Sequence, residues 1–135
     1  GDPSSTFMTA SFASTIRTYL VNTLQYTNAS TYVLLSGAIN TWDFSHDGQP
    51  LPDTIPDLAT ALALNANLRV LSVSGYHDLA TPFYQTELDI ARLGGNPRVT
   101  VRNYSGGHMT YLDDASRVLS KADLQAFYRA AAPAP

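Results

Sequence analysis

The sequence predicts an α/β protein, and three observations support this class. Two short runs, 68–73 and 99–104, are rich in the aliphatic and β-branched residues typical of strands. Segments with helical spacing of apolar residues precede, separate and follow these runs. The chain ends in the order strand, helix, strand, helix, which requires parallel strands joined by a helical crossover. We therefore expect parallel strands with helical crossovers in the second half of the chain.

The composition fits a single globular domain and excludes several classes of protein. The 135 residues carry a net charge of -3 and 44% hydrophobic residues. The eight basic residues are scattered, so we expect no nucleic-acid partner. No window reaches the roughly 18 apolar residues of a membrane span, so we expect no membrane partner. The chain has no cysteine, which excludes disulfides and thiolate metal sites, and we expect no cofactor.

The first third of the chain predicts one helix and little regular structure around it. Residues 1–8 have the composition of a loop, because Asp2-Pro3-Ser4-Ser5 is typical of turns. From Thr9 to Leu24 the apolar residues recur at helical spacing, which predicts an amphipathic helix. The apolar run 32–35 is consistent with a short strand or with an apolar patch under a loop.

A proline-rich segment, 38–56, follows and carries the only tryptophan, Trp42. Such a loop is either a lid or pocket wall, or simply a loop held in place by one aromatic side chain. Residues 57–64 then predict a short helix with Pro56 in its first turn, ended by Asn65.

The second half predicts the elements that define the fold. The strand from Leu68 breaks at Ser74-Gly75. A helix should follow, with Thr81 as its cap and Gly94-Gly95 at its end. In the strand at 98–104, successive side chains should point to opposite faces, with Val99, Val101 and Asn103 on one face. The last helix, 116–131, should turn its apolar residues inward: Val118, Leu119, Ala122, Ala126 and Phe127.

Two strands are too few for a stable parallel sheet, because such a sheet needs cover on both faces and both edges. We therefore expect most of the sheet to belong to chain outside this sequence, which reads like the interior of a longer protein. Residues 1–67 would form a helical and proline-rich cap or pocket wall. Residues 68–135 would form the C-terminal β-α-β-α unit of the sheet.

Two residues that could carry chemistry lie just after the predicted strands. Asp78 follows the first strand, and His108 follows the second after Gly106-Gly107. Carboxyl ends of neighbouring parallel strands meet at one edge, and the spacing of 30 residues suits one helix plus one strand. An acid followed by a histidine is two thirds of a Ser-His-Asp triad. The alternatives are that Asp78 only caps a turn and that His108 is an idle loop residue.

The remaining candidates for chemistry are weaker. His77 adjoins Asp78 and should point away from it, while His46 lies near Asp43 and Asp47 without the spacing of a metal-ligand motif. We therefore expect no metal site. No serine lies in a G-x-S-x-G elbow, which precedes acid and histidine in α/β-hydrolases, so the nucleophile should lie upstream of this chain.

The runs GYHDLATPF (75–83) and YSGGHMTYL (104–112) resemble the C-terminal part of the serine carboxypeptidases, especially the bacterial serine carboxypeptidase-like proteins. The likeness extends to Asp2-Pro3-Ser4, to the helix with Tyr19 and to Asn40-Thr-Trp-Asp-Phe-Ser. It therefore covers nearly the whole chain, and the two quoted runs are its specific part. The resemblance implies that this is the C-terminal portion of an α/β-hydrolase sheet.

By this resemblance Asp78 is the triad acid, His108 is the triad base and Met109 lines the leaving-group side of the pocket. We also expect Trp42 and Tyr76 to bind substrate. The resemblance implies a serine-type carboxypeptidase that acts on the C-terminus of a peptide. Its serine would lie in the N-terminal portion of the same protein, so this chain alone should be inactive. It also implies a secreted or periplasmic protein.

Two rival functions remain open. An esterase or acyltransferase would use the same triad. A non-catalytic α/β binding module would keep the same loop residues for structure. An upstream G-x-S-x-G in the same reading frame favours the hydrolase, and a start codon next to Gly1 favours the module.

Overall fold

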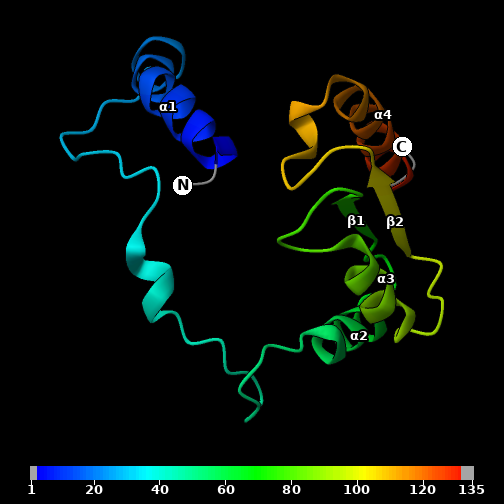
Figure 1. The fold of residues 1–135 in the computed structure, drawn as a ribbon. Helices are drawn as coiled ribbons and strands as arrows, with labels where there is room; N and C mark the ends of the chain where they lie inside the picture. Colours follow the sequence, from blue (N-terminus) through cyan, green and yellow to red (C-terminus); the bar gives the residue numbers. More distant parts are fainter. Residues whose placement is uncertain (1–2, 132–135) are drawn as a thin grey trace. The chain divides into compact units, whose positions relative to one another are not determined.

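The computed structural model describes residues 3–131. The chain divides into two compact units, Gly1–Phe44 and Ser45–Pro135, each of which has its own internal contacts. The division differs from the one expected at residue 67, because the helix before that residue belongs to the second unit. Figure 1 labels the helices and strands of both units.

The first unit consists of helix α1 (Pro3–Thr18), a π-helical turn (Tyr19–Thr23) and a 3₁₀ helix (Gly37–Thr41). The expected loop at 1–8 is wrong from Pro3 onward, since α1 begins there; Asp2 lies outside the described residues. Proline suits this position because its missing N–H has no helical partner in the first turn. The apolar run 32–35 forms no strand.

The second unit begins with a tight turn and helix α2 (Ile55–Leu64). In the turn, His46 and Gln49 exchange backbone hydrogen bonds of 3.0 and 2.9 Å. Asp47 and Gly48 between them have φ of 48° and 74°, as a two-residue hairpin turn with Asp-Gly requires. Pro56 lies in the first turn of α2, as predicted, and Asn65 ends the helix.

Strands β1 (Val70–Gly75) and β2 (Val99–Tyr104) pair in parallel, from Val70 opposite Val99 to Gly75 opposite Tyr104. Helix α3 (Phe83–Ala91) makes the crossover between them. The described part of the chain is therefore a mixed α/β structure with a two-stranded parallel sheet, as the order of elements predicted. Helix α3 ends at Ala91 with Arg92 as its C-cap, before the predicted end at Gly94-Gly95. The two glycines lie in the loop to β2 with φ of 68° and 71°, values that glycine adopts without steric cost.

Helices α3 and α4 (Asp114–Ala131) contact opposite faces of β2. Asn103 donates to Glu87 of α3 at 2.6 Å, and the Tyr104 hydroxyl donates to Asp123 of α4 at 2.8 Å. Neighbouring residues of a strand point to opposite faces, so each helix covers one side (Figure 1). Burial raises the pKa of Tyr104 to about 12, so its phenol remains a donor at neutral pH.

The predicted inward face of the last helix is only partly correct. Phe127 is half-buried against the strand pair, but the side chain of Leu119 is 58% exposed and Val118 is also exposed. Among the described residues, Leu62 and Tyr104 are the buried hydrophobic side chains. The apolar stripe near the start of α4 is therefore exposed among the described residues.

Arg98 fixes α2 to the start of β2 through main-chain carbonyl groups. Its guanidinium donates to the carbonyl oxygen of Asn65 at 2.7 Å and to that of Leu62 at 2.6 Å. These oxygens belong to the end of α2, where the last carbonyls have no helical partner. A cation at a helix C-terminus is also favourable to the helix dipole. Arg98 thus holds α2 in the second unit.

Gly75 should be intolerant of any side chain. A Cβ built on Gly75 would overlap the carbonyl oxygens of Gly106 and Gly107. We expect Gly75→Ala to lower the free energy of unfolding by about 1–3 kcal/mol, the usual cost of overpacking. Gly37→Ala is the control, because the nearest atom to its new Cβ is 3.8 Å away. Equal melting temperatures for the two variants, measured by circular dichroism, would contradict this close approach.

Candidate functional site

The two strands end side by side, and main-chain hydrogen bonds join the loops that follow them. Tyr76 N–H donates to the carbonyl of Tyr104 at 2.8 Å, which extends the strand pairing by one step. His77 N–H donates to Gly106 at 3.2 Å, and Asp78 N–H closes a turn onto Gly75 at 3.2 Å. The chain therefore leaves β1 in a hydrogen-bonded turn whose last residue is Asp78.

Asp78 and His108 meet at this edge of the sheet. His108 Nδ1 lies 2.9 Å from Asp78 Oδ2. This confirms the predicted approach of the two side chains with Nδ1 toward the carboxylate. The catalytic roles of the two residues stay predictions.

The carboxylate of Asp78 is held by donors on both oxygens. Oδ1 accepts from the N–H of Ala80 at 2.8 Å and from the N–H of Thr81 at 2.9 Å. Oδ2 accepts from the Thr81 hydroxyl at 2.7 Å, besides His108. Asp78 is only 6% exposed, so these bonds replace water almost entirely. They hold the pKa of Asp78 well below its usual range, and the hydrogen bond from the Thr81 N–H has the largest effect. Desolvation raises the pKa, but the Thr81 hydroxyl and the other donors lower it further.

Thr81 differs in role from the predicted helix cap. Helix α3 begins at Phe83, with Pro82 in the capping position and no side-chain cap. The hydroxyl of Thr81 goes to Asp78 instead and lies 3.5 Å from His108 Nδ1. Asp78 therefore caps a turn and also binds His108. The carboxylate has both of the predicted roles, the structural one and the contact with the histidine.

The arrangement defines what His108 can do. An ionised carboxylate only accepts hydrogen bonds, so Nδ1 carries the proton that faces Asp78. In the neutral ring Nε2 then has a free lone pair, and it makes no hydrogen bond to any described residue. The His108 side chain is 62% exposed, which leaves Nε2 accessible. A ring held in this tautomer can take a proton at Nε2 as a general base.

A buried hydrogen-bond network holds the loop that carries His108. Ser116, which is 0% exposed, donates to Asp113 at 2.6 Å and accepts from Gly106 N–H at 3.1 Å. Asp113 also accepts from Ser116 N–H at 2.8 Å, so it caps α4, and from the Ser105 hydroxyl at 3.1 Å. Hydrogen bonds from Ser116 keep the pKa of Asp113 low. Sequence reasoning missed this network, although an Asp just before a helix is a capping signal.

The predicted substrate-binding residues lie in both units. Met109 directly follows His108 and is half-buried. Tyr76 is exposed and packs edge-on against Phe83, with ring centroids 5.0 Å apart. Trp42 belongs to the first unit, where it follows the 3₁₀ helix and is exposed. Their part in substrate binding stays a prediction.

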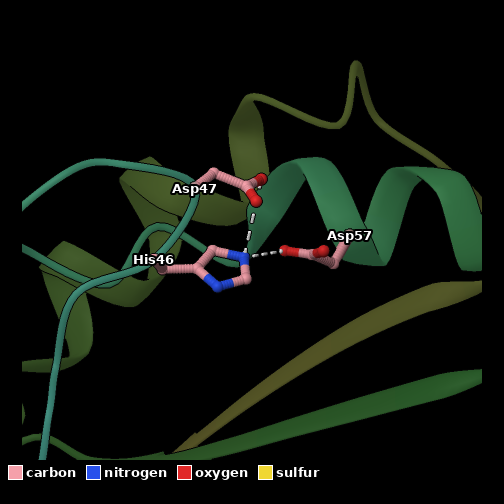
Figure 2. A group of neighbouring side chains, drawn as sticks. All are labelled: His46, Asp47 and Asp57. Atoms are coloured by element: carbon pink, nitrogen blue, oxygen red, sulfur yellow. Dashed lines mark hydrogen bonds and ion pairs between the residues drawn. The ribbon is translucent and has the colours of Figure 1, made fainter.

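A second group of ligating side chains forms at the start of the second unit. Figure 2 shows His46 between Asp47 and Asp57. His46 Nε2 lies 2.8 Å from Asp57 Oδ2 and 3.8 Å from Asp47 Oδ2. Asp57 raises the pKa of His46 by a hydrogen bond and by its charge. The sequence did not predict this group, because 11 residues separate His46 from Asp57 and only the turn brings them together.

Comparison with models of protein families, with curated proteins and with solved structures found no match. The searched helices of the described chain include none with the length and apolar character that crossing a bilayer requires. The assignment of function therefore depends on the geometry of the residues themselves. In the part of the chain that the structure describes, no serine is hydrogen-bonded to His108.

Ser116→Ala should loosen the loop that carries His108. The variant leaves Gly106 N–H buried without its acceptor, which costs about 1–3 kcal/mol of stability. Ser120→Ala on the same helix is the matched control, and we expect it to stay within about 0.5 kcal/mol of the parent chain. Urea unfolding of both variants tests this. Equal effects of the two substitutions would show that the network contributes nothing.

The depressed pKa of Asp78 predicts a loss of stability in acid. Its carboxylate titrates at about 3.9 in the unfolded chain and lower in the folded one, so its contribution is complete above about pH 3.9. That contribution falls as the pH drops through the folded-state pKa, because protonation removes the charge that the donors stabilise. Asp78→Asn cannot titrate, so its stability should fall less steeply between about pH 5 and about pH 2.5. Asp113 titrates in both proteins, so the difference in slope isolates Asp78. Parallel curves of unfolding free energy against pH for the parent chain and Asp78→Asn would refute the depressed pKa of Asp78.

Proposed function

We propose that this chain supplies the acid and the base of a Ser-His-Asp triad in a hydrolase that resembles the serine carboxypeptidases. The observation that supports this is the 2.9 Å contact between His108 Nδ1 and an ionised, hydrogen-bonded Asp78 at adjacent ends of parallel strands. That edge is where open α/β sheets place chemistry. In this proposal the strand pair is the C-terminal portion of an α/β-hydrolase sheet.

The chemistry follows from the two ring nitrogens of His108. Nε2 takes the proton of a serine hydroxyl as the serine oxygen attacks the scissile carbonyl carbon. Asp78 accepts the Nδ1 proton in a hydrogen bond and stabilises the imidazolium. The Nε2 proton then passes to the leaving amine, which departs as the last residue of the peptide. Water, activated in the same way, hydrolyses the acyl-enzyme and restores the serine.

The serine would come from the N-terminal portion of the same protein. Among the described residues no hydroxyl is hydrogen-bonded to His108 Nε2, and apolar side chains are exposed on strand β1, at Val73, and on helix α4, at Leu119. An apolar surface of this kind needs cover from further strands and helices. In the proposal that cover is the portion of the hydrolase that carries the elbow serine.

The pocket would use side chains close to the triad. Tyr76 leaves β1 two residues before Asp78, and Met109 follows His108, so both belong to the same strand ends. By its resemblance to secreted enzymes, the parent protein would act outside the cytoplasm, in the periplasm or the medium. An esterase or acyltransferase would use the same acid and base, and the choice of acyl substrate separates these activities.

The test is the longer protein that contains this chain together with an upstream G-x-S-x-G. We expect His108→Ala to reduce hydrolysis of C-terminally unblocked peptides by several orders of magnitude, because triad residues act as a unit. His77→Ala and His46→Ala should keep most of the activity, since neither imidazole is hydrogen-bonded to Asp78 in the described structure. The 135-residue chain alone should be inactive.

Three results would decide against this proposal or redirect it. Similar losses of activity in His46→Ala and His108→Ala would show that His108 is the wrong choice of catalytic histidine. Hydrolysis of esters without peptides would favour the esterase. A monomeric, cooperatively melting and inactive chain whose gene has no upstream serine elbow would favour a binding module.

A further inference from the structure

The group formed by His46, Asp47 and Asp57 has the donor set of a metal site (Figure 2). One imidazole nitrogen and two carboxylate oxygens, one from each residue, lie within 4.8 Å of one another. Imidazole together with carboxylates suits zinc and other first-row divalent ions. It is the one such group among the residues that were searched, the described part of the chain.

The backbone arranges these ligands before any ion arrives. The paired hydrogen bonds between His46 and Gln49, with positive φ at Asp47 and Gly48, fix the turn. Asp57 lies in the first turn of α2, where Leu58 N–H bonds to Thr54 at 3.0 Å. In Figure 2 the ring of His46 points from the turn toward α2, with Nε2 facing both carboxylates. The donors therefore come from two elements and converge on one point.

The separations fit the coordination sphere of a small divalent ion. Zinc binds nitrogen and oxygen at about 2.0–2.2 Å, which places tetrahedral ligands about 3.3–3.5 Å apart. The two measured separations from His46 Nε2, 2.8 and 3.8 Å, lie on either side of this value. Asp47 is 82% exposed on its turn, so its side chain can rotate to complete the set. Asp47 and Asp57 are exposed to solvent, so a water molecule can supply a fourth ligand.

The charges around the imidazole favour a cation. The imidazole of His46 interacts electrostatically with three carboxylates, those of Asp57, Asp47 and Asp53. The neighbouring cation is Arg92, which is already paired with Asp53 at 2.6 Å. Asp89 also lies 3.7 Å from Arg92, so the carboxylates near His46 outnumber this arginine, and the negative charge favours a divalent cation.

We propose that His46, Asp47 and Asp57 bind a divalent transition-metal ion of the Zn²⁺ type, which joins the turn to helix α2. A bound ion takes the lone pair of His46 Nε2, so protons compete with the metal for this nitrogen. The site is separate from Asp78 and His108 and does not depend on the proposed hydrolase activity. Its function would be to fix the first residues of the second unit onto α2.

The experiment is a calorimetric titration of the metal-free 135-residue chain with Zn²⁺. We expect one ion per chain, a rise in melting temperature on saturation, and binding that strengthens as the pH rises. A proton competes for His46 Nε2, so affinity should increase by up to about tenfold per pH unit below the pKa of His46. His46→Gln should abolish this binding. Asp47→Asn, which alters an exposed side chain and leaves the fold intact, should weaken it at least about tenfold.

Two controls separate this site from the others. His77→Gln changes a histidine outside the group and should bind Zn²⁺ as the parent chain does. His108→Gln removes the imidazole that faces Asp78 and should also leave the binding unchanged. The proposal is overturned by an absence of saturable binding at about 1 mM Zn²⁺. It is also overturned by binding that survives both His46→Gln and Asp47→Asn, or by binding that disappears with His108→Gln.

Discussion

The carboxylate of Asp78 is the point on which the second unit depends. It receives main-chain donors from Ala80 and Thr81, the Thr81 hydroxyl and His108 Nδ1. These bonds join the exit of β1, the approach to α3 and the loop after β2. A carboxylate that is 6% exposed would be costly to ionise without them. The same bonds that make its charge tolerable also set the tautomer of His108, so structure and chemistry here share one cause.

The loops can meet only because their backbones approach so closely. Gly75 admits the carbonyl oxygens of Gly106 and Gly107 where any side chain would collide, and Gly106 in turn faces the backbone of Thr110. The fully buried hydroxyl of Ser116 accepts a hydrogen bond from Gly106 N–H. The glycines permit the approach and the hydrogen bonds fix it. Neither would hold His108 in place alone, because glycine by itself adds freedom to a loop.

The sequence predicted the parts of this structure that are set by local pattern. The apolar strands and the helix between them placed Asp78 and His108 at one sheet edge, and the structure has them 2.9 Å apart. It failed where distant partners decide the outcome. Leu119 matches an inward-facing stripe but is exposed among the described residues. Thr81 reads as a helix cap, but α3 begins only at Phe83, with Pro82 in the capping position, and the Thr81 hydroxyl donates to Asp78. His46 and Asp57 meet through a turn whose positive φ values no periodicity reveals.

The balance between hydrogen bonding and hydrophobic burial explains why the acid–base pair is complete although the sheet is so small. Among the described residues the buried hydrophobic side chains are Leu62 and Tyr104, so apolar packing contributes little rigidity around the strands. The orientation of Asp78 comes from donors within three residues of it and from one histidine across the strand pair. Local bonds of this kind need no large core, because each closes a short loop and loses little chain entropy. A nucleophile has no such local source: an elbow serine needs its own strand, turn and helix. A chain of this size can therefore hold Asp78 and His108 together by itself, while in the proposed hydrolase the nucleophile would require a larger sheet.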